Sequence, residues 1–400
     1  MRVLHVGAGN LFGGIEVNLL TLARFRHECP EMDAEYGFCY DGKPANELRT
    51  LGVNVHIFGP ARYSRPWTVV AARRRLAETL HERAFDAVIC HETWVHGLFA
   101  PVVGRAGIPL VFWAHDRHPG SGGWLEWLAR RNRPAQVICN SRYSAETIPR
   151  FWPGVPCEVV YCPVAPLPKP NDGARAAFRR QQGAADDVVV IVQVGRWEPH
   201  KGHIAHIEAL AKLRDLPGWA CWQVGAPQRA EEIAYFERVQ ALAQNRRIAD
   251  RVNFLGWQRD LGTVLAAADI YCQPNIRPEP FGITLVEALY AGLPVVAANE
   301  AGPREIVTEE CGVLAPPGDA AALAEALRAI ICTPDRRALL GRGGPARAKA
   351  ICEPARGLSN FWAILARQGG EADPQVTILA NAQNFPNGAP ARESDSIALR

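Results

Sequence analysis

Short apolar runs alternate with amphipathic stretches along nearly the whole chain, an alternation typical of β-α-β units with parallel sheets. Two such series are separated by residues 163–172, where four prolines in ten positions predict a linker. We therefore predict an α/β fold with two Rossmann-like, doubly wound domains. Ligands are expected in the crevice between them, where strands end and helices begin.

The predicted elements fall into similar halves. Strands are expected at residues 2–7, 35–40, 53–58, 86–91, 109–114, 136–140 and 158–162, and helices at 14–26, 68–83, 124–131 and 142–150. After the linker, strands are expected at 187–195, 219–225, 252–255, 269–273, 294–298 and 312–315. Helices are expected at 203–214, 229–245, 260–267, 283–291 and 319–331, with further helix over 335–367. The predicted units are an N-terminal domain (1–165), a C-terminal domain (173–350), a helix that returns to the first domain (351–368) and a disordered tail (369–400).

Composition excludes several classes of protein. The chain has 400 residues, of which 48% are hydrophobic and 21% charged, and it lacks an apolar run long enough to span a membrane. Its net charge of +3 does not favour a nucleic-acid-binding protein. The 11 cysteines include no Cys-x-x-Cys pair, and most lie in apolar runs, as expected of buried thiols in a reducing compartment. With no signal-peptide core at the start, we predict a cytoplasmic protein.

Arginines are concentrated in one part of the first domain. Residues 61–150 hold 13 basic side chains, all Arg, and 7 acidic ones. This stretch suits contact with an anionic membrane surface or a phosphorylated substrate, but a solvated helix surface is the plainer interpretation.

The segment Glu279–Glu287 is the most informative one in the second domain. It follows an apolar strand and opens an apolar helix, so the amides of Phe281, Gly282 and Ile283 lie where the helix dipole favours a phosphate. Glu287 is expected about one turn inside this helix, pointing back to its start. One acid can then face a sugar and the other a ribose. In the alternative interpretation, Glu287 is a surface residue of the helix and Glu279 an ordinary acid at its N-terminus.

The segment Val194–Gly202 delivers two cations to the same crevice. Arg196 offers a planar fork and Lys201 a point charge, a combination that suits a diphosphate leaving group. The spacing of a Walker loop is absent, which argues against an NTPase.

Two features of the first domain are candidates. Phe12 stands where a dinucleotide fingerprint needs a third small residue, so we interpret Gly14 as a close backbone approach to a ligand phosphate or acceptor, with a simple turn as the alternative. His115 ends the buried strand 109–114 at the crevice and is the best polar candidate in this domain, although a lone histidine is often structural. No metal site is predicted: His200, His203 and His206 lack suitable acidic or Cys partners, and His91, Glu92 and His96 are interpreted in the same way.

Together these segments resemble the retaining glycosyltransferases of family 4, which have the GT-B fold with a central cleft between two domains. The motif that carries the resemblance is Glu-x7-Glu with Phe-Gly after the first acid, followed by Gly292–Ala297 and Gly302–Val307. The resemblance implies a nucleotide-diphosphate-sugar donor as the substrate, with no cofactor and no metal. The resemblance implies that Arg196 and Lys201 bind the diphosphate and that Glu287 binds the ribose. It implies that Glu279 binds the sugar together with the backbone of Phe281, Gly282 and Ile283. His115 and Gly14 are expected to contribute from the opposite domain.

The predicted activity is transfer of a hexose from a UDP- or GDP-sugar to a saccharide or lipid-linked acceptor, in bacterial polysaccharide or glycoconjugate synthesis. The anomeric configuration is expected to be retained, and contact with the inner membrane face through the Arg-rich surface is expected to be peripheral. Two alternatives stay open: a sugar-nucleotide epimerase of the same fold and a non-catalytic sugar-nucleotide-binding protein.

Overall fold

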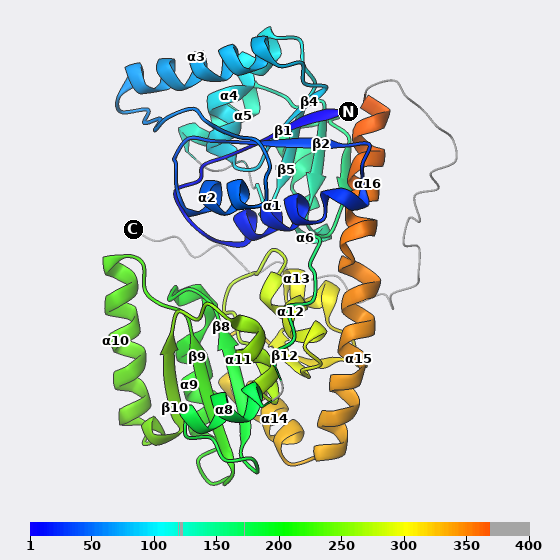
Figure 1. Ribbon diagram of the computed structural model, residues 1–400. Coiled ribbons are helices and arrows are strands. Elements are labelled where there is room, and N and C mark those ends of the chain that lie inside the picture. Colours follow the sequence, from blue (N-terminus) through cyan, green and yellow to red (C-terminus); the bar gives the residue numbers. More distant parts are fainter. Residues whose placement is uncertain (119, 121–122, 172, 369–400) are drawn as a thin grey trace.

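The computed structural model describes residues 1–118, 120, 123–171 and 173–368, and the predicted tail at 369–400 lies outside them. Two parallel sheets form the framework, one of seven strands and one of six (Figure 1). Their strand orders are β3-β2-β1-β4-β5-β6-β7 and β10-β9-β8-β11-β12-β13. The predicted α/β fold with two doubly wound units is confirmed.

The N-terminal domain is built on the first sheet. Its strands are β1 (Arg2–Gly7), β2 (Asp33–Phe38), β3 (Val55–Ile57), β4 (Ala87–Cys90), β5 (Leu110–Ala114), β6 (Gln136–Cys139) and β7 (Cys157–Val159). Its helices are α1 (Gly14–Arg24), η1 (Arg26–Glu28), α2 (Lys43–Thr50), α3 (Pro66–Glu82), α4 (Thr93–Arg105), α5 (Trp124–Arg131), α6 (Arg142–Ala145) and α7 (Ile148–Phe151).

The C-terminal domain is built on the second sheet. Its strands are β8 (Val189–Val194), β9 (Trp219–Val224), β10 (Val252–Gly256), β11 (Ile270–Gln273), β12 (Val295–Ala298) and β13 (Gly312–Ala315). Its helices are α8 (Ala174–Gln181), η2 (Pro199–Lys201), α9 (His203–Ala211), α10 (Ala230–Asn245), η3 (Ala249–Arg251), α11 (Leu261–Ala267), α12 (Ile283–Tyr290), α13 (Ala301–Ile306), α14 (Ala320–Ile331) and α15 (Pro334–Cys352), followed by α16 (Pro354–Gln368).

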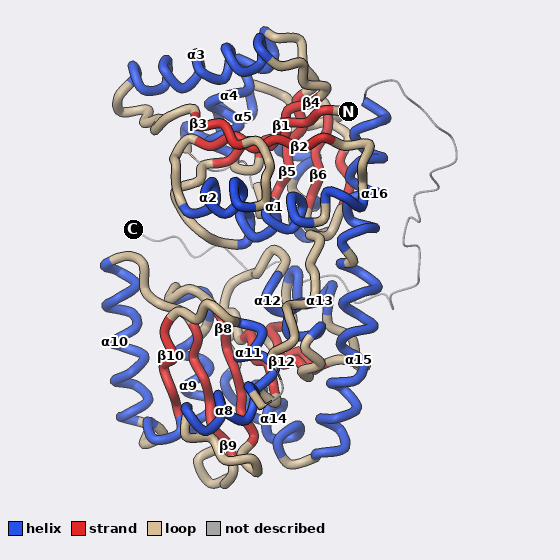
Figure 2. Tube along the Cα trace, viewed as in Figure 1, coloured by secondary structure: helices blue, strands red, loops and turns tan. Residues whose placement is uncertain are grey.

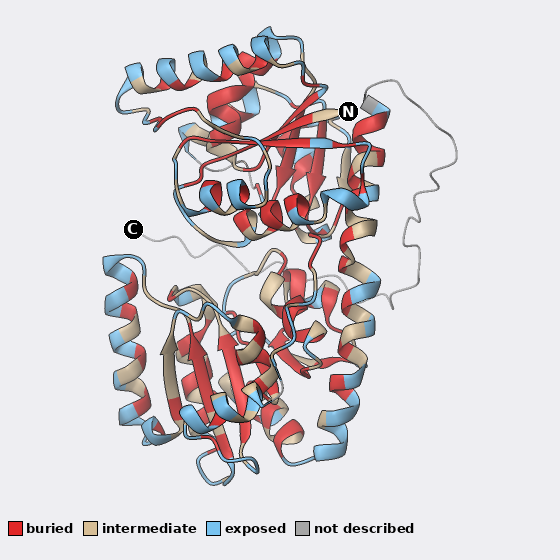
Figure 3. Cartoon of the chain, viewed as in Figure 1, coloured by how far each residue is buried: buried red, intermediate tan, exposed pale blue. Residues whose placement is uncertain are grey.

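Both sheets are covered on both faces, which is why their strands are nearly continuous apolar runs (Figures 2 and 3). In the N-terminal domain, α3, α4 and α5 pack on one face, and α1, α2 and α16 pack on the other. In the C-terminal domain, α8, α11, α12 and α15 cover one face, and α9, α10 and α14 cover the other. The carboxyl ends of the strands are left free for the loops that carry polar groups.

All thirteen predicted strands are present, but four helices were not predicted: α2, α4, α8 and α13. Helix α4 contains Gly97, Pro101 and Gly104 and is buried along most of its length, so it lacks a polar face that would mark it as a helix. The single helix predicted at 142–150 is two short ones, α6 and α7.

The helix predicted over 335–367 is divided. Helix α15 ends at Cys352 in the C-terminal domain, and α16 begins at Pro354, a residue that fits the first turn of a helix. The two helices run along one side of both domains (Figure 1). Leu358, Phe361 and Ile364 of α16 are buried in the core of the N-terminal domain.

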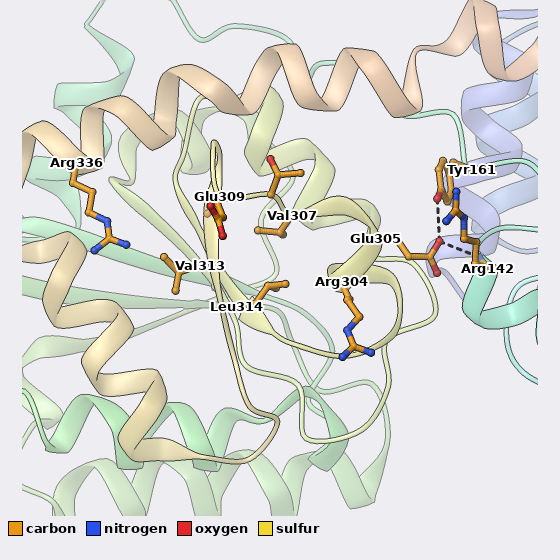
Figure 4. A pocket seen from close by; sticks show the side chains of 11 residues that line it. Arg142, Tyr161, Arg304, Glu305, Val307, Glu309, Val313, Leu314 and Arg336 are labelled. Carbon is orange, nitrogen blue, oxygen red and sulfur yellow. Dashed lines mark hydrogen bonds between the residues drawn. The ribbon is translucent and has the colours of Figure 1, made fainter. Parts of the chain in front are cut away.

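Glu305 of α13 joins the two domains. Its carboxylate accepts hydrogen bonds from the backbone amides of Arg142 (3.0 Å) and Tyr143 (2.9 Å) at the start of α6, and from the hydroxyl of Tyr161 (3.0 Å) after β7. Figure 4 shows this contact at one end of a pocket of about 1020 Å³, which Arg304 and Glu309 also line.

We predict that Glu305→Ala lowers the free energy of unfolding by about 2 kcal/mol, because one substitution leaves three donors without their acceptor. Thermal and chemical unfolding measure the change. Glu309→Ala is the matched control, since this exposed side chain lines the same pocket but forms no hydrogen bond with any residue that the structure describes. Equal stability of both variants would show that Glu305 does not couple the domains.

Candidate functional site

Arg196 and Lys201 lie on a loop that is fixed to its neighbours by close backbone contacts. The indole of Trp197, which is 1% exposed, donates a hydrogen bond to the carbonyl of Gly225 (2.8 Å). Gly202 has a φ of +75°, and a Cβ there would overlap the carbonyl of Pro274 after β11. The loop after β8 is thereby attached to the ends of β9 and β11, and both cations come to the carboxyl edge of the sheet.

Both cations are paired with carboxylates. Arg196 lies 2.8 Å from Glu198, and the Nζ of Lys201 donates to the Oε2 of Glu279 at 2.5 Å. Asn275 donates to the same oxygen at 3.2 Å. Burial alone would raise the pKa of Glu279, but the charge of Lys201 and these hydrogen bonds outweigh it and lower that pKa, so the carboxylate is ionised. The sequence predicted neither ion pair.

The loop before α12 presents free backbone amides. Phe281 is buried and anchors the loop, and Gly282 has a φ of +104° that sets the turn into the helix at Ile283. Within the described part of the chain, the amides of these three residues donate no hydrogen bond. Gly302 at the start of α13 packs directly against this loop. Its amide donates to the carbonyl of Glu279 (2.9 Å), and a Cβ at position 302 would overlap the backbone of Phe281.

Glu287 lies one turn inside α12 and is 9% exposed. Burial raises its pKa to about 7, so the carboxyl group is ready to ionise when it gains hydrogen-bond donors. Burial also raises the pKa of Tyr271 on β11, and the charges of Glu287 and Glu279 add to that rise. The two carboxylates of the Glu-x7-Glu motif therefore both raise the pKa of the Tyr271 hydroxyl.

The N-terminal domain meets this cluster with its own loops. Gly14 begins α1 directly opposite Ile283, whose Cδ1 would lie 3.7 Å from a Cβ at position 14. Burial raises the pKa of Glu16 on α1, whose carboxylate accepts a hydrogen bond from Gly13, and Arg196 across the boundary partly offsets the rise. The start of α1 and the loop after β8 therefore face each other.

His115 is half-buried and directly follows the end of β5, as predicted. Its Nε2 is hydrogen-bonded to the Nδ1 of His91 at 2.9 Å. The next residue, Asp116, has a pKa raised by burial and by the charge of Glu279, whereas His200 lowers it. The end of β5 thus belongs to the same electrostatic environment as Glu279 of the C-terminal domain. The structure thus brings the loops of Arg196, Lys201 and Glu279 opposite those of Gly14 and His115, whereas Glu287 is buried one turn inside α12.

Comparisons with known proteins agree with this arrangement. A family model described as Glycosyltransferase Family 4 matches residues 12–166, and one described as Glycosyl transferases group 1 matches residues 174–347. A D-inositol 3-phosphate glycosyltransferase from Saccharomonospora viridis is 30% identical over 295 residues, or 68% of each chain. The chain belongs to glycosyltransferase family 4.

Two further relatives of this glycosyltransferase are informative. A phosphatidyl-myo-inositol mannosyltransferase from Mycobacterium leprae is 37% identical over 186 residues, and the match spans 44% of each chain. The crystal structure of HepE from Anabaena in complex with UDP and glucose has a TM-score of 0.81 at 25% identity, covering 92% of this chain and 100% of HepE. The predicted membership of family 4 and the GT-B fold are confirmed.

Sequence reasoning missed several groups at the site of the glycosyltransferase. Glu198 and Asn275 pair with Arg196 and Glu279, and their positions directly after β8 and β11 were the available signal. Glu92, set aside as a metal ligand, follows β4 and accepts a hydrogen bond from the amide of Ala8 (3.0 Å). Burial raises the pKa of Glu92 to about 8. Among the residues that the structure describes, no group of three or more His, Cys, Asp or Glu is placed to hold a metal ion.

We predict that Gly302→Ala destabilises the glycosyltransferase by about 1–3 kcal/mol, because the new methyl group displaces the backbone of Phe281. Thermal and chemical unfolding measure the change in stability. Gly104→Ala is the matched control: a Cβ there meets open space, and alanine favours a helix over glycine by about 1 kcal/mol. Unchanged stability in Gly302→Ala would refute the supporting role of α13.

Proposed function

We propose that this glycosyltransferase is a retaining, metal-independent hexosyltransferase that uses a UDP- or GDP-sugar and a saccharide or lipid-linked acceptor in bacterial polysaccharide or glycoconjugate synthesis. The observation that carries the proposal is the convergence of Arg196, Lys201 and the free amides before α12. Two relatives support it, a D-inositol 3-phosphate glycosyltransferase and a phosphatidyl-myo-inositol mannosyltransferase. HepE, crystallised with UDP and glucose, favours a UDP-hexose as the first donor to test.

The C-terminal domain, residues 173–350, holds the donor. Arg196 and Lys201 bind the diphosphate together with the amides at the start of α12. The raised pKa of Glu287 suits a group that accepts hydrogen bonds from ribose hydroxyls, because such bonds favour its charged form. Glu279 binds hydroxyls of the hexose once the diphosphate has taken its place beside Lys201.

Ion-pair exchange explains why the two cations are already paired. A partly buried ammonium group without a counter-charge is costly, and Glu279 offsets that cost for Lys201 before the donor arrives. The diphosphate then takes over as counter-charge, and charge that grows on the leaving group is stabilised by both cations. They supply the positive charge that a divalent metal provides in other transferases. The departing phosphate accepts the acceptor's proton on the same face of the sugar, which retains the anomeric configuration.

The N-terminal domain, residues 1–165, holds the acceptor, with Gly14 and His115 facing the donor. We place the protein in the cytoplasm because all 11 cysteines are free and nine of them are buried. No helix in the described ranges is long and apolar enough to cross a membrane. For a lipid-linked acceptor, we propose peripheral contact with the membrane.

A Trp–Arg surface on the N-terminal domain suits such contact. Helix α3 exposes Trp67, Val70 and Arg74, and α5 exposes Trp124, Trp127 and Arg131; both triplets have the spacing i, i+3, i+7 and so share one helix face. Tyr63 packs edge-on against Trp124, with centroids 4.6 Å apart, and this contact brings the two helix starts together.

The charge of this surface favours an anionic bilayer over other occupants. Residues 62–82 and 123–133 hold eight arginines and three glutamates. Tryptophan rings that are 56–68% exposed next to arginines are suited to the headgroup region, where an apolar ring and a cation are both stabilised.

Two substitutions test the proposed donor site, and we predict a different effect for each. Glu287→Ala weakens UDP binding about 10- to 100-fold, because it removes hydrogen bonds to the ribose. Lys201→Ala lowers kcat for transfer by about 100-fold or more while changing UDP affinity less, since charge on the leaving group grows in the transition state. Calorimetry with UDP-, GDP- and ADP-sugars, followed by transfer assays, measures both.

The same assays separate the alternatives. Conversion of a UDP-sugar to its epimer without acceptor would identify an epimerase, and tight binding without turnover across acceptors would identify a binding protein. Wild-type kinetics in both variants would refute the donor site.

We predict that Trp67→Glu together with Trp127→Glu lowers co-sedimentation with phosphatidylglycerol vesicles at least tenfold, because two apolar anchors become anionic. Binding of the unmodified protein should fall with rising salt and be weak on phosphatidylcholine. Leu339→Glu, at another exposed apolar side chain (59%) in the C-terminal domain, is the control. A similar loss in the control, or none in the double variant, would exclude this surface.

A further inference from the structure

Three histidines of the N-terminal domain form one continuous hydrogen-bonded chain. The Nδ1 of His5 lies 2.9 Å from the Nε2 of His91, and the Nδ1 of His91 lies 2.9 Å from the Nε2 of His115. The neighbouring rings are stacked, with centroids 5.2 Å apart in both pairs. His5 and His91 are 1% exposed, so only His115 reaches the domain boundary.

Strand register explains how the chain crosses the sheet. His5 on β1 pairs in register with Ile89 on β4, two residues before His91. The register of β4 with β5 gives the same offset of two between His91 and His115. A step of two keeps every side chain on one face of the sheet and moves it towards the carboxyl edge. The chain therefore runs diagonally from the core under α16, where His5 contacts Phe361, to the site.

Each ring in the chain is neutral. Burial lowers the pKa of His5 and of His115 to about 3, and it lowers the pKa of His91 well below its ordinary value. His118 and His5 are the other titratable groups that lower the pKa of His115. A neutral imidazole has one N–H donor and one acceptor nitrogen, so the direction of one hydrogen bond fixes the direction of the next.

The inner end of the chain sets this direction. In the described part of the chain, the Nε2 of His5 has no hydrogen-bond partner and is buried next to Tyr36 and Phe361. An N–H without a partner in an apolar core is rarer than an acceptor without one. The proton of His5 therefore belongs on Nδ1, which donates to His91. His91 in turn donates from Nδ1 to the Nε2 of His115, and the proton of His115 is left on its own Nδ1.

We propose that His91 and His5 are positioning residues that hold His115 as the Nδ1–H tautomer, so that it donates a hydrogen bond to a hydroxyl oxygen of the bound sugar. The inference rests on the proposed function of His115 at the donor–acceptor site. The amide of Asn140 adds to the positioning, since it donates to the backbone carbonyl of His115 at 3.2 Å. Ring orientation and tautomer are then both fixed before substrate binds.

The test uses the full-length protein labelled with ¹⁵N-histidine, in which long-range ¹H–¹⁵N correlations distinguish the two tautomers. His115→Gln assigns the signal. We expect His115 to be the Nδ1–H form in the unsubstituted protein and a mixture of both forms in His91→Phe. An Nε2–H form in the unsubstituted protein, or an unchanged tautomer in His91→Phe, overturns the proposal.

Steady-state kinetics complete the test. We expect His91→Phe to lower kcat/KM for transfer about tenfold while UDP affinity changes less than twofold. His91→Gln should recover most of the loss, because its amide accepts from His5 and donates to His115 at once. His96→Phe is the matched control: His96 is 0% exposed and bonds to the carbonyl of Asn132, but it packs on the other face, against Phe112.

The outcomes separate this inference from the proposed function. A protein that transfers no sugar but has the expected tautomers refutes the function and leaves the chain of histidines intact. An active enzyme in which His91→Phe has wild-type kinetics, or in which His96→Phe loses as much activity, refutes the positioning role alone.

Discussion

The packing of α13 against the loop before α12 is the contact on which the site depends. Because Gly302 lacks a side chain, α13 can begin directly against the backbone of Phe281. The amide of Gly302 also donates a hydrogen bond to the carbonyl of Glu279. One turn later, Glu305 receives three hydrogen bonds from the N-terminal domain. A single short helix therefore fixes the donor loop on one side and the partner domain on the other.

The two acids of the Glu-x7-Glu motif have opposite environments, although they belong to one loop and helix. Glu279 is beside the ammonium group of Lys201, which lowers its pKa, whereas burial raises the pKa of Glu287 to about 7. Glu279 is thus charged in the free protein and has a partner to exchange. Glu287 gains its full charge when hydroxyl donors approach. The seven residues between them place one acid in the loop and the other in the helix, and this placement gives their carboxyl groups different pKa values.

Sequence periodicity was sufficient for the strands and for the edge at which the site lies, because buried parallel strands are apolar runs and their carboxyl ends collect the polar residues. It was insufficient for α4, which is apolar on most sides, and for α13, whose six residues are too few to show a period. The Lys201–Glu279 pair joins residues 78 positions apart, and only the fold brings them together. The histidine chain was missed because His5, His91 and His115 become neighbours only through strand register.

The two halves of the site differ in charge. The C-terminal half presents Arg196 and Lys201, each paired with a carboxylate, whereas burial disfavours the charged forms of His115 and Glu92 in the N-terminal half: it lowers the pKa of His115 to about 3 and raises that of Glu92 to about 8. A neutral surface does not compete with the cations for the diphosphate, and it can still exchange hydrogen bonds with hydroxyl groups. The chemistry of the charged half therefore suits an anionic ligand, and that of the neutral groups suits hydroxyl groups. Because the pKa of His115 lies far below neutral pH, its ring stays neutral across the physiological range of pH.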